Sequence, residues 1–496
     1  MVCVFNNSLT YHNKISHMRN AHRLLWQIAL VDVDFAQHLL AMNESNRSAG
    51  NFLEKRLSIE DLKRFSLAFN KDPKNTLALN AVTENGVAAV ALSRKEVDRE
   101  NFTFSHLIES PEATNQERSG RCWLFSGLSV LTLEAMKKLN LKTFELSEIY
   151  QMFWDKLEKA NYFLENIIET REEPLDGRLV SSLLSDPISD GGQWNMFVNI
   201  VEKYGVIPKT FMPETANSSN SDPMNTLLAS KLREYAKLLR DTNRKGASMT
   251  ELRERKREFM EEFYRLLCIN LGVPPETFYW EWRDKDGVFH RKGNTDPVQF
   301  YKEYIGTQLN DFVSLINAPN KAFNKLYTVK YLSNVVGGRE VRFLNVDLKT
   351  MKTATIEMIK HNHAVWFGCD VGKMLQTDMG AMDLNIYDYE SVYGTKFQLD
   401  KAARLDYEDS DMTHAMVITG VDLDEYDKPM KWRVENSWGA AIGDQGYMFM
   451  LDEWFDEYLY EIVVRKEYLA PDLLKILDTE PVVLPLWDSM CSLGSC

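Results

Sequence analysis

Cys122 opens the stretch of this sequence that most constrains how the chain can fold. The apolar residues after it recur at every third or fourth position: Leu124, Leu128, Leu131, Ala135 and Leu139. This spacing predicts a helix over 122–139 that turns one face to the core, and Lys137 and Lys138 suit its C-terminal end. We therefore expect a thiol at a helix N-terminus, where the helix dipole favours its ionised form.

The residues just before Cys122 fit a nucleophilic thiol. Gly120 permits a tight turn immediately before the helix. Gln116 lies six residues before the cysteine. Its side-chain amide and the backbone N–H of Cys122 can both be aimed at an oxyanion that develops during acyl transfer. Without further partners, however, Cys122 has the more ordinary interpretation of a buried structural cysteine.

Two partners for the thiol are found far along the chain. His414 leads the apolar run 415–421, which predicts a β-strand. Asn436 comes 22 residues later, directly after the short β-rich run 432–435. Its amide can hold an imidazole in one orientation, while Trp438 shields that hydrogen bond from water. Alone, each residue has a structural explanation, but the order cysteine, histidine, asparagine indicates thiol catalysis.

The rest of the sequence predicts an α+β architecture with two lobes. Ser58 and Asp61 form a capping-box pattern, which predicts a helix over Ile59–Phe69. A second helical zone, rich in Lys, Arg and Glu, covers 226–271 and ends before Gly272. Helices thus dominate the first half of the chain, whereas the β-rich runs gather in the second half.

Together these features resemble the papain-like cysteine peptidases. That family shares Gln-(five residues)-Cys-Trp, a His-Ala pair that leads a strand, and Asn-Ser-Trp-Gly. In this sequence the motifs begin at Gln116, His414 and Asn436. By this resemblance Cys122 is the nucleophile, His414 the general acid and base, Asn436 the residue that orients the imidazole, and Gln116 the oxyanion donor.

A further segment resembles the part of that family that lines the substrate. Residues 190–194 read Asp-Gly-Gly-Gln-Trp, which is similar to the family's substrate-lining glycines. The resemblance implies that Gly191, Gly192 and Trp438 bind substrate. It also implies that the backbone of Gly192 pairs with a substrate residue just upstream of the scissile bond.

Two departures narrow the resemblance to one branch of the family. Secreted members carry a disulfide-bonded cysteine three residues before the nucleophile, where this chain has Ser119. His414 follows Cys122 by 292 residues, whereas roughly 130–150 separate the two in those enzymes. The sequence resembles the bleomycin hydrolases from about Leu57 to its C-terminus. The matching stretches are 119–125, 271–279, 364–373, 412–416, 432–439 and 480–490.

This resemblance implies a two-lobed papain-like fold, with a helical lobe and a β-barrel-like lobe. It implies a peptidase domain over 51–496, with a large helical insertion at about 216–330 and a C-terminal arm at about 480–496 that lies in the cleft. The terminal carboxylate of such an arm anchors the free amine of the substrate, and here that group belongs to Cys496. Because this tail is longer than those of the family, we also expect trimming to a small residue such as Gly494.

The implied activity is that of a cysteine aminopeptidase. Such an enzyme removes N-terminal residues from peptides, and hydrolyses amides such as bleomycin, through an acyl-enzyme. The implied assembly is a homohexamer, and no metal or organic cofactor is implied. Two alternatives stay open: a nucleic-acid-binding hexamer with secondary peptidase activity, and a papain-like endopeptidase whose arm leaves the cleft open. The formal net charge of −14 weighs against the first.

Cysteine content and the N-terminus bear on the compartment. The six cysteines include no CxxC pair, which indicates the reduced thiols of a cytoplasmic protein. The sequence contains no run of 18 or more apolar residues, which is the length that a membrane-spanning helix needs. Residues 1–50 form an extension without a recognised counterpart. Because 1–31 contain Lys and Arg but no Asp or Glu, a mitochondrial transit peptide is the alternative location.

Overall fold

The computed structural model describes residues 55–97 and 102–495. The chain divides into two units, Met1–Gly86 and Val87–Cys496. The expected extension at 1–50 and the terminal residue Cys496 both lie outside the described residues. Within the described ranges, no helix combines the length and the apolar character that a membrane span requires.

The described part of the first unit consists of two helices, α3 (Ile59–Lys71) and α4 (Pro73–Asn85). The Ser58 hydroxyl accepts a hydrogen bond from the Asp61 amide at 3.0 Å, and the Asp61 carboxylate accepts one from the Ser58 amide at 3.1 Å. This confirms the predicted capping box. No residue of either helix is buried, and their large apolar side chains are exposed: Ile59, Leu62, Phe65, Leu67, Phe69, Leu77 and Leu79.

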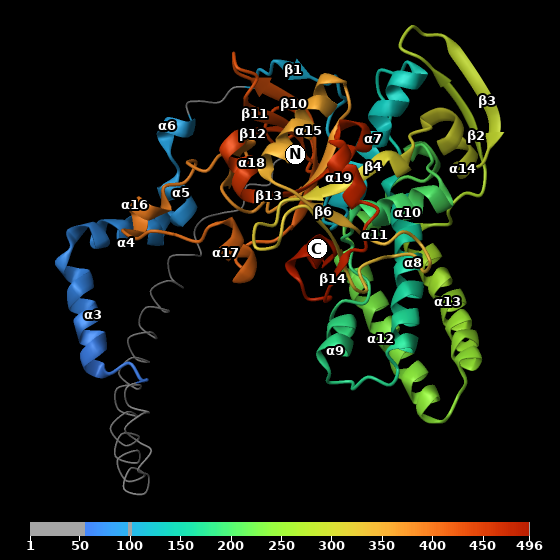
Figure 1. The fold of residues 1–496 in the computed structure, drawn as a ribbon, viewed down its shortest axis with the longest axis horizontal. Coiled ribbons are helices and arrows are strands. Elements are labelled where there is room, and N and C mark those ends of the chain that lie inside the picture. Colours follow the sequence, from blue (N-terminus) through green and yellow to red (C-terminus); the bar gives the residue numbers. More distant parts are fainter. Residues whose placement is uncertain (1–54, 98–101, 496) are drawn as a thin grey trace, which may run out of the picture. The chain divides into compact units, whose positions relative to one another are not determined.

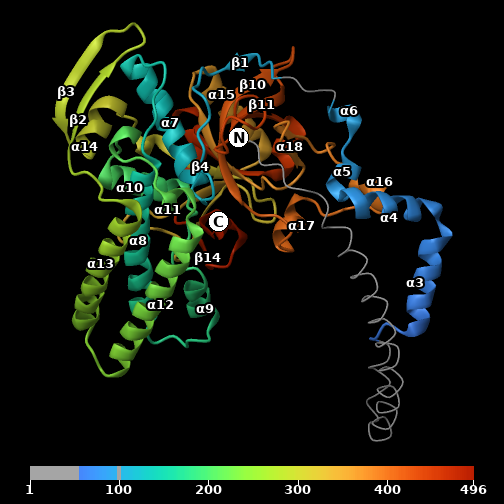
Figure 2. The ribbon, with the colours of Figure 1, turned by 180° about the vertical axis from the view of Figure 1, so that it is seen from behind.

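Helices dominate the first half of the larger unit. They are α5 (Val87–Ala91), α6 (Arg94–Val97), α7 (Cys122–Leu139), α8 (Glu148–Glu169), α9 (Arg178–Ser185), α10 (Trp194–Tyr204), α11 (Ala216–Ser219), α12 (Asp222–Arg244) and α13 (Met249–Leu271). The long helices α8, α12 and α13 lie side by side (Figures 1 and 2). Charged α12 still packs because Leu228, Leu232 and Leu239 recur on one buried face.

Twelve strands of the described residues form one sheet. Its order is β14 (Val482–Leu484), β5 (Lys325–Val329), β6 (Phe343–Asn345), β4 (Phe312–Ile316), β13 (Leu459–Arg465), β7 (Val365–Cys369), β10 (His414–Leu423), β11 (Pro429–Glu435), β12 (Tyr447–Leu451), β9 (Ala381–Met382) and β8 (Leu375–Gln376), and β1 (His106–Leu107) also pairs with β10. The central strands β7 and β10 are buried along almost their whole length. This burial explains why the run 415–421 is mostly apolar, and the structure confirms the predicted strand.

Shorter helical elements connect these parts. They are η2 (Lys209–Phe211), α14 (Pro297–Phe300), η3 (Tyr301–Ile305), η4 (Leu309–Asp311), α15 (Leu348–Lys360), α16 (Tyr389–Tyr393), α17 (Lys401–Asp406), α18 (Asp452–Tyr458), η5 (Lys466–Tyr468), α19 (Pro471–Ile476) and η6 (Ser489–Ser495). After α19 the chain continues through β14, which pairs in parallel with β5, to η6. Helices and strands are thus both plentiful, which confirms the predicted α+β class.

The segment expected as a helical insertion, 216–330, contains more than helices. Its first part holds α11, α12 and α13, and a hairpin of β2 (Phe278–Arg283) and β3 (Phe289–Thr295) follows. Its last part contributes β4 and β5 to the main sheet. The limits of the insertion therefore stay a prediction.

Helix α7 packs against the sheet where β10 begins. Ser126 Oγ donates a hydrogen bond to the carbonyl oxygen of Ala415 at 3.0 Å. Trp366, in β7, donates from Nε1 to the carbonyl oxygen of Trp123 at 3.2 Å. At its other end α7 stops at Asn140, whose backbone adopts the left-handed conformation (φ 56°). The N-terminus of α7 is thereby fixed beside the first residues of β10.

Candidate active site

Cys122 is the first residue of α7, as the sequence predicts, and only 1% of its surface is exposed. Arg121, the residue before it, makes no side-chain cap, so the first amides of α7 are available to groups at the helix N-terminus. Burial raises the pKa of the Cys122 thiol to about 11. The backbone N–H of Ala415 opposes this shift because it stabilises the thiolate, whereas the Asp190 carboxylate adds to it.

His414 begins β10, and Asn436 directly follows β11. Because β10 and β11 are antiparallel neighbours, the two residues meet: His414 Nε2 lies 2.8 Å from Asn436 Oδ1. The same oxygen accepts a bond from the Ser437 amide at 2.8 Å, and Asn436 Nδ2 donates to the Met448 sulfur at 3.7 Å. Since Oδ1 only accepts, His414 Nε2 carries a hydrogen and Nδ1 is left as the basic nitrogen.

Trp438 lies against the imidazole of His414. The two ring centroids are 5.0 Å apart, at an interplanar angle of 37°. Burial lowers the pKa of His414 to about 4, although the hydrogen bond with Asn436 opposes this shift. Burial thus disfavours an isolated charge on either Cys122 or His414. A thiolate beside an imidazolium has no net charge, so the two ions together cost less than either alone.

Gln116 is held at both ends of its side-chain amide. Ser437 Oγ donates to Gln116 Oε1 at 2.5 Å, and Gln116 Nε2 donates to the carbonyl oxygen of Ser119 at 2.5 Å. The backbone N–H of Gln116 also bonds the Ser437 carbonyl oxygen at 2.8 Å. One Nε2 hydrogen is left for another acceptor. Ser437, which sequence reasoning missed although it follows Asn436 directly, therefore fixes the orientation of this amide.

The loop with Gly191 and Gly192 lies directly beside α7. Trp123 Nε1 donates to the carbonyl oxygen of Asp190 at 2.6 Å. A Cβ atom added to Gly192 would lie 2.5 Å from the Trp123 ring, so only glycine allows this close approach. The Gly120 amide in turn donates to the Asp190 carboxylate at 3.1 Å. The glycine loop and the turn before α7 are therefore tied together.

Two buried lysines of α8 hold this loop. Lys156 Nζ lies 2.6 Å from Asp190 Oδ1 and donates to the Ser189 carbonyl oxygen at 2.9 Å. Lys159 donates to the carbonyl oxygens of Ser189 and Gly191 at 3.0 and 2.5 Å. Sequence reasoning missed both lysines, because a local pattern does not distinguish a buried lysine from a solvated one. Their three-residue spacing, which puts both lysines on one face of the helix, was the available signal.

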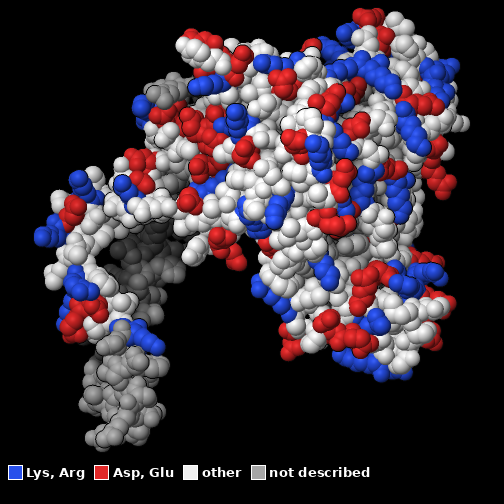
Figure 3. Space-filling model, viewed as in Figure 1, with Lys and Arg blue, Asp and Glu red and all other residues white. Residues whose placement is uncertain are grey.

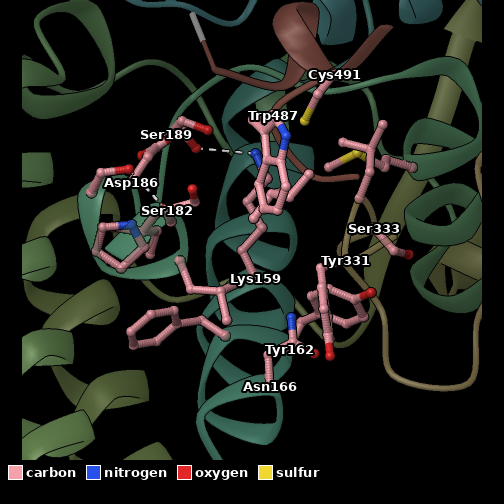
Figure 4. A pocket seen from close by; sticks show the side chains of 18 residues that line it. Lys159, Tyr162, Asn166, Ser182, Asp186, Ser189, Tyr331, Ser333, Trp487 and Cys491 are labelled. Atoms are coloured by element: carbon pink, nitrogen blue, oxygen red, sulfur yellow. Dashed lines mark hydrogen bonds between the residues drawn. The ribbon is translucent and has the colours of Figure 1, made fainter. Parts of the chain in front are cut away.

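Leu486, Trp487 and Cys491, from the segment that is expected to form a C-terminal arm, line a cavity next to this loop (Figure 4). The cavity has a volume of about 310 Å³. Lys159 and Ser189 lie on its wall from the side of the loop, and Trp487 and Cys491 from the arm. Burial raises the pKa of the Cys491 thiol to about 12, so this cysteine is a neutral wall residue at ordinary pH.

The same segment also contacts the residues just before β10, the strand that begins with His414. Ser492 Oγ accepts a hydrogen bond from the backbone amide of Met412 at 3.0 Å, two residues before that histidine. Pairing of β14 with β5 fixes the start of the arm. Cys496, whose carboxylate was expected to anchor the substrate amine, lies outside the described residues. Its anchoring role therefore stays a prediction.

Comparison with known proteins shows the family to which this chain is related. A model of the family described as "peptidase C1-like" matches residues 56–491. The chain belongs to this family. Bleomycin hydrolase from Homo sapiens is 45% identical over 449 residues, which cover 88% of this chain and 99% of that protein. Aminopeptidase C from Streptococcus thermophilus is 42% identical over 441 residues, which cover 88% and 99%.

A solved structure agrees with these sequence relatives. The crystal structure of PepW from Lactobacillus rhamnosis HN001 is 42% identical, with a TM-score of 0.86, and the match covers 88% of this chain and 99% of that one. The predicted papain-like α+β fold and the resemblance to the bleomycin hydrolases are thus confirmed.

The structure brings together the residues that the sequence singled out. Cys122 faces the Ala415 amide next to His414, and Asn436 and Gln116 are linked to one another through Ser437. Their chemical roles, and those of the glycine loop, stay predictions. Among the described residues, no group of three or more His, Cys, Asp or Glu is arranged to hold a metal ion.

Proposed function

We propose that this chain is a cysteine aminopeptidase that hydrolyses peptides and related amides from a free N-terminus. The observation that carries the proposal is the hydrogen bond from His414 Nε2 to Asn436 Oδ1, made beside the N-terminus of the helix that begins with Cys122. Relatives named bleomycin hydrolase and aminopeptidase C support the same activity.

In the proposed reaction the Cys122 sulfur attacks the carbonyl carbon of the N-terminal residue while its proton passes to His414 Nδ1. Gln116 Nε2 and the Cys122 amide donate to the oxyanion of the tetrahedral intermediate. His414 then protonates the leaving amine, and a thioester remains on the sulfur. In the second half His414 takes a proton from water, which attacks the thioester and releases the amino acid. Asn436 keeps the imidazole turned so that Nδ1 stays available.

Hydrolysis of an unblocked aminoacyl fluorogenic amide and of its N-acetylated counterpart tests this proposal. We expect the wild type to cut only the unblocked substrate under reducing conditions, and Cys122→Ala to cut neither. Cleavage of both substrates by wild type alone would keep the thiol mechanism but favour the endopeptidase alternative. Equal rates for wild type and Cys122→Ala would refute the proposed mechanism.

We also propose that the chain forms a homo-oligomer, for which the homohexamer is our expectation. The exposed apolar side chains of α3 and α4 support it, because unpaired apolar faces of this kind are costly in water. Leu62→Glu/Phe65→Glu is therefore expected to lower the mass measured by light scattering. Leu227→Glu/Ile269→Glu, at residues 72% and 74% exposed on α12 and α13, is the matched control. An unchanged mass in the α3 variant would contradict this role for the helix.

We place the enzyme in the cytoplasm, where thiols stay reduced. The cysteines that the structure describes, Cys122, Cys268, Cys369 and Cys491, are all free, which supports this location. The nucleic-acid-binding alternative has no support on the face shown in Figure 3, where basic and acidic side chains are interspersed.

A further inference from the structure

A second cavity, of about 420 Å³, lies along α7 beyond the catalytic cysteine. Phe125 and Leu128 of α7 form part of its wall, one and two turns after Cys122. The other walls come from residues 111–114, from the segment that leads into α8, and from the end of β11. The proposed peptidase mechanism uses none of the side chains that line this cavity.

Glu435 lines the cavity from the last position of β11. Only 6% of the residue is exposed. Its Oε1 accepts a hydrogen bond from Ser129 Oγ at 2.8 Å, whereas its Oε2 has no hydrogen-bond partner with ordinary geometry among the described residues. Burial raises the pKa of Glu435 to about 7. Ser129, the positive charge of Arg433 and the Tyr447 hydroxyl all oppose this shift.

Glu148 lines the same cavity from the first position of α8. It is 2% exposed, and its Oε2 also has no hydrogen-bond partner in the described part of the chain. Lys209 Nζ lies 3.4 Å from that oxygen, but it is shared with Glu145 at 2.5 Å. Burial raises the pKa of Glu148 to about 8, opposed by Lys209, while Glu145 and Glu214 add to the rise.

The character of the remaining wall indicates which ligand suits these carboxyls. Phe125, Leu128 and Phe144 present apolar and aromatic surface beside them. A bare metal ion does not fit, because the described residues include no set of three donors arranged for one. An organic ammonium satisfies both parts of the wall: its N–H groups donate to carboxylates, and its alkyl part and charge are favoured next to aromatic rings.

We propose that this cavity binds a small organic ammonium ion, held by the carboxylates of Glu435 and Glu148 and by the rings of Phe125 and Phe144. Each carboxyl that is protonated in the empty cavity gives up its proton when the ammonium arrives, so the ligand keeps its own protons and H⁺ is released to solvent. Binding is therefore expected to strengthen as the pH rises toward about 8 and to change little above it.

Isothermal titration calorimetry of the full-length chain with n-butylammonium chloride tests the site, with sodium chloride and 1-butanol as matched salt and neutral ligands. We expect saturable binding of n-butylammonium alone, with heats that depend on the ionisation enthalpy of the buffer because protons are released. This readout needs only the wild-type protein. Absence of saturable binding, or heats that are independent of the buffer, would overturn the proposal.

Variants then locate the site. Glu435→Gln/Glu148→Gln is expected to weaken n-butylammonium binding at least tenfold. Glu461→Gln is the matched control, because Glu461 is also fully buried, has unpartnered carboxylate oxygens and a pKa raised by burial, but does not line this cavity. Equal affinity in wild type and in the double variant would place the ligand elsewhere, for example where substrate amines bind. Weaker binding in Glu461→Gln alone would also refute the assignment.

Discussion

Two carboxyl groups in the larger unit are buried to almost the same degree but in opposite surroundings. Asp190, beside the glycine loop, is 5% exposed, and Glu461, in the middle of β13, is 0% exposed. Asp190 is surrounded by donors. Lys156 Nζ lies 2.6 Å away, Asn225 Nδ2 donates at 2.8 Å, and Ser221 Oγ and the Gly120 amide also donate to it.

Glu461 has no such partners. Neither of its carboxylate oxygens has a hydrogen-bond partner with ordinary geometry among the described residues. Burial raises the pKa of Glu461 to about 8, and the Ser314 hydroxyl on the neighbouring strand opposes this only in part. At Asp190 burial acts in the same direction, but the Lys156 ammonium and the hydrogen bonds outweigh it and hold the pKa well below its usual range.

The difference shows two ways in which a fold can accommodate a buried acid. One surrounds the charge with donors, which fixes the position of every group that donates. The other leaves the acid protonated, which avoids the cost of an isolated charge but fixes little. The first arrangement is found under the loop that is expected to contact substrate, where Gly191 must be held in place. The second is found inside a sheet that backbone hydrogen bonds already hold.

Removal of Lys156 should deprive the buried Asp190 of its cation, and this should destabilise the folded protein. Lys156→Met leaves the Asp190 carboxylate buried without its cation, so we expect the free energy of unfolding at pH 7 to fall by about 3–5 kcal/mol. Urea denaturation monitored by tryptophan fluorescence measures this change. Lys475→Met is the control: its ion pair with Asp472 is exposed on both sides, so its loss should change the free energy of unfolding little.

A second variant shows whether the charge or the packing is responsible. Lys156→Met/Asp190→Asn removes both charges, and it should recover part of the stability that Lys156→Met loses. If the double variant is less stable than Lys156→Met, the loss comes from packing around the lysine stem, and the contrast with Glu461 does not rest on charge.

Sequence patterns predicted the parts of this site that depend on short stretches of chain. The helix at Cys122, the strand at His414 and the turn residue Asn436 each follow from local spacing. The donors around Asp190 do not. They come from α8, α11–α12 and the turn before α7, and a sequence alone does not reveal that these distant segments meet at one carboxylate.

The helical zone predicted over 226–271 shows the same limit. Its charge and length indicated helix, and its end at Leu271 before Gly272 was predicted correctly. The structure, however, breaks the zone at Gly246, where φ is 88°, into α12 and α13. The following hairpin of β2 and β3 was not predicted either. Both features depend on how the segment folds back on α8, which local propensity does not encode.

Glu461→Gln should remove the pH dependence of stability that the buried Glu461 carboxyl causes. A glutamate has a pKa of about 4.3 in an unfolded chain, whereas the folded value here is about 8. The stability that the protonated form contributes is complete below the unfolded value and is lost as the pH rises through the folded one. Between pH 5 and pH 9 wild type should therefore lose about 4 kcal/mol of stability relative to the variant, which should be the more stable protein at pH 9.

Thermal unfolding midpoints of wild type and Glu461→Gln, measured from pH 5 to 9, test this expectation. Other buried acids titrate in both proteins, so the difference between the two curves isolates Glu461. At pH 5 the variant should be no more stable than wild type, because the neutral carboxyl is already suited to its site. Parallel curves over the whole range would show that Glu461 is ionised in the fold, and the contrast with Asp190 would fail.

Lys159→Met should have the smallest effect on stability and a selective effect on activity. Lys159 pairs with Asp155 at 2.8 Å, but burial holds the pKa of Asp155 above its usual value despite this pair, so Asp155 can take up a proton when the lysine is lost. We therefore expect a loss of only about 1–3 kcal/mol. The carbonyls of Ser189 and Gly191 lose their donor, however, and the loop beside Trp123 is less well held.

That second consequence should appear in the kinetics of the proposed aminopeptidase reaction. A loosened loop weakens the binding of substrate before and during the reaction alike, so KM should rise several-fold while kcat changes less. Lys159→Arg keeps a cation within reach of Asp155, and it should recover stability more fully than KM, because a guanidinium does not reproduce the two carbonyl contacts of one ammonium. A fall in kcat at unchanged KM would show instead that Lys159 acts on the chemical step, and that the donors around the glycine loop do more than hold it in place.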